Sequence, residues 1–132
     1  MKWLKRIFGI SATPPPGNAA GWEFANQVIK IDLNQMPELA RPGSAVRLEG
    51  KGLPVRTLVV HGKDGGFHAF ANRCTHMGRR IDILPGTDRI ECCSVSKSTF
   101  DYGGQPLGGA AKKPLRVFAV TLSDNELTIQ LT

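Results

Sequence analysis

The sequence predicts an all-β domain of antiparallel strands, arranged as a sandwich or small barrel. Short apolar runs are separated by turn signals at intervals of roughly ten residues, which is typical of such folds. Fifteen glycines and nine prolines among 132 residues supply those turns. No strong helical pattern is present inside the domain, because the one candidate turn, residues 33–40, is limited by Pro37.

A chain of 132 residues is long enough for one domain with its own core, and we place that domain at residues 21–132. Residues 1–20 are predicted to be a basic amphipathic tail and a spacer built on Pro14-Pro15-Pro16. A stiff proline run should uncouple the tail from the core. We therefore expect removal of residues 1–16 to leave the domain folded.

The tail allows three interpretations. Its apolar side chains would share one face of a short helix, opposite the basic ones (Trp3, Leu4, Ile7 and Phe8 against Lys2, Lys5 and Arg6). Residues 1–10 could thus make a weak contact with an anionic membrane surface or a partner groove. So short a helix is marginal alone, which favours a frayed tail, and the apolar run 7–12 is short for a signal peptide.

Alternating apolar residues and β-branched content predict seven strands: residues 28–33, 45–48, 55–61, 67–71, 89–92, 115–122 and 127–131. Lys63-Asp64-Gly65-Gly66 should fold residues 57–61 back onto 67–71 as a hairpin. Ser123-Asp124-Asn125 should join the last two strands in the same way. The strand at 67–71 leads directly into the segment that carries the chemistry.

That segment is Cys74-Thr75-His76-Met77-Gly78, followed after residues 79–92 by Cys93. A thiolate and an imidazole one residue apart can be presented by one loop to one metal centre, and a second cysteine loop can close the site. In the alternative interpretation, the cysteines are small buried side chains and His76 is a surface histidine. His61 and His68 lie in predicted strands, and we expect neither to be a ligand.

With their surroundings, these residues resemble the Rieske [2Fe-2S] ferredoxin family, whose pattern is Cys-x-His, a spacer, then Cys-Pro-x-His-Gly. The first loop matches in full, and Cys93, Ser98, Phe100 and Asp101 fall in register in the second. Glycines and prolines downstream resemble the segment that covers the family's cluster (Gly103-Gly104, Pro106, Gly108-Gly109 and Pro114). The resemblance runs from about Asn26 to Thr132 and implies a Rieske-like sandwich or barrel, with a two-loop cluster-binding subdomain at one end.

The resemblance also implies the cofactor, a [2Fe-2S] cluster, and its ligands. In the family one iron takes two thiolates and the other takes two imidazoles. Cys74 and Cys93 would bind the first iron, and His76 would bind the second.

The second loop departs from the family pattern where it matters most. Ser96 stands in place of the second histidine, and Ser94 and Lys97 replace the flanking Pro and Gly. Serine is a poor substitute, because its hydroxyl holds its proton tightly and iron in such clusters prefers softer donors. Cys92 could supply a thiolate only if the backbone bends, since neighbours in an extended segment face opposite sides.

The charge and the cysteine content indicate the kind of partner and the cellular compartment. The net charge of +6 is spread without a dense basic run or interleaved aromatic residues, which argues against nucleic acid. The basic residues near the loops would attract an acidic redox protein, such as an oxygenase or reductase subunit, or would form a solvated surface (Arg79, Arg80, Lys97, Lys112 and Lys113). Three cysteines, an odd number, and no apolar run of membrane-spanning length indicate a cytoplasmic protein, peripheral to a membrane at most.

Two functions follow from these observations. The first is a small Rieske-type electron-transfer protein with an atypical ligand set, which is not itself an enzyme. The second is a cluster-free binding module or accessory subunit of a redox enzyme, similar to nitrite reductase small subunits that lack the Rieske ligands. The intact Cys-x-His-x-Gly favours the first function, and the missing histidine favours the second.

Overall fold

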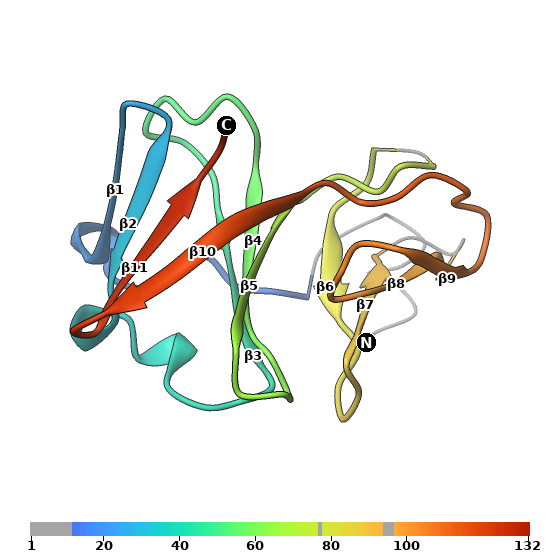
Figure 1. The fold of residues 1–132 in the computed structure, drawn as a ribbon, viewed down its shortest axis with the longest axis horizontal. Coiled ribbons are helices and arrows are strands. Elements are labelled where there is room, and N and C mark those ends of the chain that lie inside the picture. The colour runs from blue at the N-terminus through green and yellow to red at the C-terminus, as the bar shows by residue number, and fades with distance from the viewer. Residues whose placement is uncertain (1–11, 77, 94–96) are drawn as a thin grey trace.

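A computed structural model describes residues 12–76, 78–93 and 97–132 as two antiparallel sheets that lie side by side (Figure 1). The larger sheet has seven strands in the order β1-β2-β11-β10-β5-β4-β3, and the smaller has four in the order β6-β7-β8-β9. The strands are β1 (Trp22–Ala25), β2 (Val28–Asp32), β3 (Ser44–Leu48), β4 (Thr57–His61), β5 (Phe67–Ala71), β6 (Ile81–Ile83), β7 (Arg89–Cys92), β8 (Thr99–Asp101), β9 (Pro106–Gly108), β10 (Val117–Ser123) and β11 (Glu126–Gln130). The prediction of an all-β antiparallel fold is confirmed.

The larger sheet bends at its longest strand. In β10, Val117 and Phe118 pair with β5, whereas residues 119–123 pair with β11. This change of partner divides the sheet into two halves that enclose the first core. That core consists of apolar side chains from both halves and from the turns between them (Trp22, Ile29, Ile31, Met36, Leu39, Val46, Leu48, Val59, Ala69, Ala71, Phe118, Leu127, Ile129 and Leu131).

The two hairpins predicted from turn residues are present. Strand β4 pairs with β5 in a register that sets Thr57 opposite Ala71 and His61 opposite Phe67. Strands β10 and β11 are joined by Asp124 and Asn125, both with positive φ, as a tight hairpin turn requires. The bounds of β5 and β7 agree with the prediction because strong turn signals flank both segments, whereas β4 begins at Thr57, two residues after the predicted start of that strand.

The smaller sheet holds the second core and follows the first loop directly. Its buried side chains include two of the three cysteines (Ala45, Leu58, Val60, Phe70, Cys74, Ile81, Ile90, Cys92, Phe100, Ala111 and Leu115). Strands β6, β8 and β9 have three residues each, too few for an alternation pattern to be read from the sequence. Strand β1 was also missed, since its four residues follow the proline spacer with no separate turn signal.

Helical structure in the described residues is confined to 3-10 turns of three residues each, η1 (Ala19–Gly21), η2 (Leu33–Gln35) and η3 (Pro37–Leu39). The single turn predicted at residues 33–40 is thus two short turns, and Pro37 begins the second. Asp32 starts η2 by accepting a hydrogen bond from the backbone N–H of Asn34 at 2.9 Å. None of these turns approaches the length and apolar character of a membrane-spanning helix.

The proline spacer differs from its prediction, because its described residues are tied to both sheets. Thr13 is buried, and its backbone N–H and hydroxyl both donate to the carboxylate of Asp82 in β6, at 3.0 and 2.6 Å. On the other side, the N–H of Arg47 in β3 donates to the carbonyl of Pro14 at 3.0 Å. The spacer therefore lies across the seam between the two sheets.

Candidate metal centre

The two cysteine loops meet at a short extended run between them, residues 79–81. The N–H of Cys74 donates to the carbonyl of Arg79 at 2.7 Å, and the N–H of Cys93 donates to the carbonyl of Arg80 at 2.9 Å. Carbonyls of consecutive residues in an extended segment point to opposite sides. The run therefore holds the two ligand loops, one on each side of it. This confirms the prediction that the loops are adjacent at one end of the domain.

The three cysteines are buried in two different settings. Cys74 and Cys92 belong to the second core, whereas Cys93 does not. The N–H of Cys92 donates to the carbonyl of Ser98 at 2.8 Å, and this bond extends the pairing of β7 with β8. Cys92 thus packs as a strand residue with Ile81, Ile90 and Phe100. Because neighbouring residues in a strand face opposite sides, Cys92 does not share the orientation of Cys93, which does not favour Cys92 as a substitute ligand.

Burial controls the chemistry of the Cys93 thiol. Desolvation raises the pKa of Cys93 to about 11, with smaller contributions in the same direction from Asp82 and Cys92. The site therefore favours the protonated thiol at neutral pH. Iron must displace that proton when it binds, which lowers the affinity of this site for metal.

The remaining ligand positions are less defined. His76 is exposed on the first loop, and Ser96 lies outside the described residues. Among residues 12–76, 78–93 and 97–132, no three His, Cys, Asp or Glu side chains are grouped closely enough to hold a metal ion. His61 and His68 have partners of their own, because His61 Nδ1 lies 2.8 Å from the carbonyl of Leu39 and His68 Nε2 lies 3.0 Å from an oxygen of Asp64.

Lys97 adopts a backbone conformation that favours glycine. Its φ is +52°, in the left-handed region that glycine adopts without strain. Lys97 occupies the position where the family pattern has Gly. A lysine at this position is therefore strained where a glycine would not be.

The segment 103–116 covers the second loop through close backbone contact. The N–H of Ala111 donates to the hydroxyl of Ser98 at 3.0 Å, and both residues are buried. A Cβ atom on Gly109 would lie 2.5 Å from the Cα of Ser98, so only glycine fits there. The hydroxyl of Thr75, in the first loop, donates to the carbonyl of Lys113 at 2.8 Å. The covering segment thus binds both loops.

Two arginines support the first loop, and sequence reasoning missed the role of one of them. The guanidinium of Arg56 donates to the carbonyls of Asn72 and Gly78, at 3.0 and 2.9 Å. Desolvation lowers the pKa of Arg56 from its ordinary value, yet an arginine remains charged at neutral pH. Arg80 forms a two-point ion pair with Glu49, at 2.7 and 2.8 Å. No sequence signal links either arginine to its partner, because each pair is formed by tertiary structure.

The surface around these loops is positively charged. Five basic side chains are exposed there, and residues 72–80, 93–99 and 105–119 contain no Asp or Glu (Arg73, Arg79, Lys97, Lys112 and Lys113). Arg80, by contrast, is neutralised by Glu49. Of the five basic residues predicted near the loops, Arg79, Lys97, Lys112 and Lys113 are exposed, and Arg80 is paired with Glu49.

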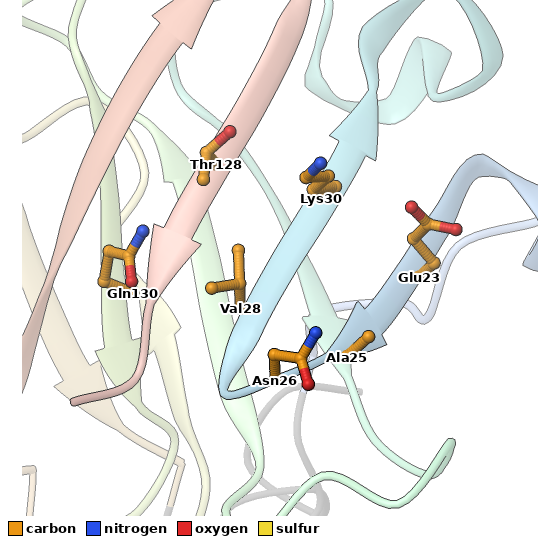
Figure 2. A pocket seen from close by; sticks show the side chains of 7 residues that line it. All are labelled: Glu23, Ala25, Asn26, Val28, Lys30, Thr128 and Gln130. Atoms are coloured by element: carbon orange, nitrogen blue, oxygen red, sulfur yellow. The ribbon is translucent and has the colours of Figure 1, made fainter.

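A separate depression lies far from these loops, on the outer face of the larger sheet. It has a volume of about 320 Å³ and is lined by side chains from β1, β2 and β11 (Glu23, Ala25, Asn26, Val28, Lys30, Thr128 and Gln130). Figure 2 shows these side chains on one face of the three strands, where Lys30 stands opposite both Glu23 and Thr128 in the strand register. Because the oppositely charged Glu23 and Lys30 pair in the strand register, this depression is not a candidate for the metal centre.

Comparisons with known proteins settle the family. The sequence profile of the Rieske [2Fe-2S] domain matches residues 30–119. The chain belongs to the Rieske [2Fe-2S] domain family. No curated protein matches the sequence, so the individual relatives are solved structures.

Three of those Rieske structures illustrate the shared fold. A chain in the complex of reduced oxygenase and oxidized ferredoxin in carbazole 1,9a-dioxygenase aligns with a TM-score of 0.66 and 22% identity, over 81% of this chain and 95% of that one. The ferredoxin of carbazole 1,9a-dioxygenase from Nocardioides aromaticivorans IC177 aligns with a TM-score of 0.61 and 22% identity, over 76% and 93%. The plasma membrane Rieske protein PetC3 from Synechocystis PCC 6803 aligns with a TM-score of 0.54 and 25% identity, over 64% and 85%.

The residues present fit the family's cluster in part. Cys74 and Cys93 are buried thiols on two joined loops, as the iron with two thiolates requires. A buried side-chain amide two residues before Cys74, that of Asn72, has no acceptor among the residues that the structure describes. His76 would supply one imidazole for the other iron, and the sequence offers no second imidazole in the second loop.

Proposed function

We propose that this Rieske protein is a small electron-transfer protein whose [2Fe-2S] cluster is held by Cys74, His76 and Cys93 and has an atypical fourth ligand. The observation that carries the proposal is the pair of hydrogen bonds from Cys74 and Cys93 to the consecutive carbonyls of Arg79 and Arg80. A chain with no use for the cluster has no evident need to keep both cysteine loops tied to one short run.

The protein's own residues would prepare the site rather than catalyse a reaction. The cluster, when bound, accepts and releases single electrons. Burial of both thiols excludes water, and the contacts of Ser98 and Thr75 with the covering segment hold the loops in place. A protein that takes up and passes on single electrons in this way would serve a partner enzyme as an electron carrier.

The basic residues near the ligand loops indicate that a partner which binds there would be acidic. Exposed cations without neighbouring carboxylates would speed encounter with an acidic redox protein, such as an oxygenase or reductase subunit. One of the similar structures is a complex of an oxygenase with a ferredoxin. Three thiols suit a cytoplasmic location, and the basic residues 1–10 suit a weak contact with an anionic membrane surface.

A second candidate is a cluster-free accessory subunit. The second loop favours it, because Ser96 stands where the family pattern has its second histidine, and Ser94 and Lys97 replace the flanking Pro and Gly. In that case the loops would serve only as a scaffold for the basic residues near them.

The deciding experiment is reversible reduction of the protein after anaerobic incubation with iron and sulfide. We expect a visible absorption band that bleaches on reduction and a one-electron paramagnetic signal, both retained in Cys92→Ala and lost in Cys74→Ala. A protein that stays folded and shows neither signal would favour the scaffold.

A further inference from the structure

The side-chain amide of Asn72 is an unused donor beside the first loop. Asn72 is fully buried, and its Nδ2 has no hydrogen-bond partner within the part of the chain that the structure describes. A buried N–H group without an acceptor costs free energy comparable to a lost hydrogen bond, so native structures keep few of them. Such a donor calls for an acceptor that binds beside it.

Every other polar group of Asn72 is already paired. Its N–H donates to the carbonyl of Arg56 at 2.8 Å, and its own carbonyl accepts from the Arg56 guanidinium at 3.0 and 3.1 Å. Its Oδ1 accepts from the N–H of Ile81 at 2.7 Å. Exchanging Oδ1 and Nδ2 would set two donors against each other, so the orientation of the amide is fixed.

The amide and Cys74 face the same side of one backbone run. Asn72 binds the N–H of Ile81, and Cys74 binds the carbonyl of Arg79. In an extended run, groups two residues apart point to the same side, whereas the carbonyl of Arg80 between them points away, toward Cys93. Asn72 and Cys74 therefore lie next to each other on the side of the run opposite Cys93.

We propose that the Asn72 amide donates a hydrogen bond to the sulfur of Cys74 when that sulfur is bound to iron. This inference rests on the proposed function. A neutral thiol is a weak acceptor, whereas an iron-bound thiolate carries negative charge and accepts strongly. Reduction adds further negative charge, so this donor stabilises the reduced form and raises the reduction potential. Asn72 is thus a positioning residue that tunes the cluster through a ligand.

The direct test needs no substitution. The chain has five asparagines, and the other four lie in the larger-sheet half or in the segment that precedes it (Asn18, Asn26, Asn34 and Asn125). Protein labelled with ¹⁵N only in asparagine side-chain amides is loaded, reduced and studied by pulsed paramagnetic resonance. We expect a ¹⁵N coupling to the reduced cluster, absent in Asn72→Ala. A loaded protein without that coupling overturns the inference and leaves the proposed function intact.

The potential gives an independent readout with a matched control. Asn72→Ala should shift the ratio of reduced to oxidised protein at a fixed potential by about tenfold, or about 59 mV for one electron. Asn18→Ala removes another asparagine side-chain amide, which donates to Gln35 outside both ligand loops, and should leave the potential unchanged. Equal potentials in Asn72→Ala and the unsubstituted protein overturn the inference.

Measurements in two protein variants distinguish a failure of the proposed function from a failure of the proposal about Asn72. The same measurements are made in the unsubstituted chain and in Ser96→His/Lys97→Gly, which has the family's ligand types. If only the double variant loads, the proposed function fails, while Asn72 is still tested. If neither background takes up a cluster, both proposals fall.

Discussion

The hydroxyl of Thr13 donates a hydrogen bond of 2.6 Å to the carboxylate of Asp82, 69 residues further along the chain. The backbone N–H groups of Ala12 and Thr13 add two more bonds to the same carboxylate, each of 3.0 Å. A stretch that looks like a spacer in the sequence is therefore part of the domain's structure. It joins β6, which follows the first ligand loop, to β3 of the larger sheet.

Two truncations should distinguish the contribution of the tail to stability from that of the hydrogen bonds to Asp82 and Arg47. Removal of residues 1–10 should leave the free energy of unfolding nearly unchanged. Removal of residues 1–16 should lower it by about 1–3 kcal/mol, because the bonds to Asp82 and Arg47 are lost, while the domain remains folded. Urea unfolding of the two truncated proteins measures the difference. Equal stabilities would show that the anchor contributes nothing.

Gly109 should be far more sensitive to substitution than another glycine with the same backbone conformation. Gly109 and Gly86 both have positive φ, +81° and +77°, but only a Cβ on Gly109 would meet neighbouring atoms. Gly86→Ala should cost about 1–2 kcal/mol of stability from backbone strain alone. Gly109→Ala adds a clash with the backbone of Ser98 and should cost about 2–5 kcal/mol. Similar losses in thermal unfolding of the two variants would contradict the close packing of segment 103–116 on the second loop.

The ion pair between Arg80 and Glu49 should make stability depend on pH. The hydrogen bond from Arg80 holds the pKa of Glu49 below its ordinary value of 4.5. A lowered folded-state pKa gives stability that is present above 4.5 and is lost as the pH falls through the folded-state value. Glu49→Gln should therefore be less stable than the unsubstituted protein at pH 7, and the gap should close in acid. Glu126→Gln, at an exposed position, should show no such gap.

The sequence predicted most where local rules decide the structure. Strands β5 and β7 have the predicted bounds because turn residues flank them, whereas β4 begins two residues later than predicted. His61 and His68 have partners outside the loops. The three-residue strands β6, β8 and β9 were missed, since only pairing with neighbours defines them.

The supporting contacts of the site could not be predicted for the same reason. The N–H groups of Cys74 and Cys93 find their acceptors in the run 79–81, and Asn72 and Arg56 meet 16 residues apart. The positive φ of Lys97 is a further case, because lysine has no preference for that conformation. The match to the family's residue pattern predicted which residues form the two ligand loops. It did not predict the hydrogen bonds that hold these loops in place.

Restoring the family residues at two positions should improve the site. Lys97→Gly relieves a left-handed backbone and should raise stability by about 0.5–1 kcal/mol, whereas Lys112→Gly, without positive φ, should not. Ser96→His together with Lys97→Gly supplies an imidazole for the second iron and should give slower loss of iron to a chelator. Cys92→Ala should leave uptake unchanged, because Cys92 is a residue of β7 and faces the side opposite to its neighbour Cys93. A folded double variant that holds no more iron than the unsubstituted chain would show that the loops cannot accept a cluster.

The most direct test of the account is the iron and acid-labile sulfide content of the unsubstituted protein after anaerobic reconstitution. The account predicts two irons and two sulfides per chain, the content of the family's [2Fe-2S] cluster, in a coloured protein. Cys74→Ala and Cys93→Ala should each contain none while remaining folded. A folded, colourless protein that contains neither iron nor sulfide under the same conditions would contradict the account.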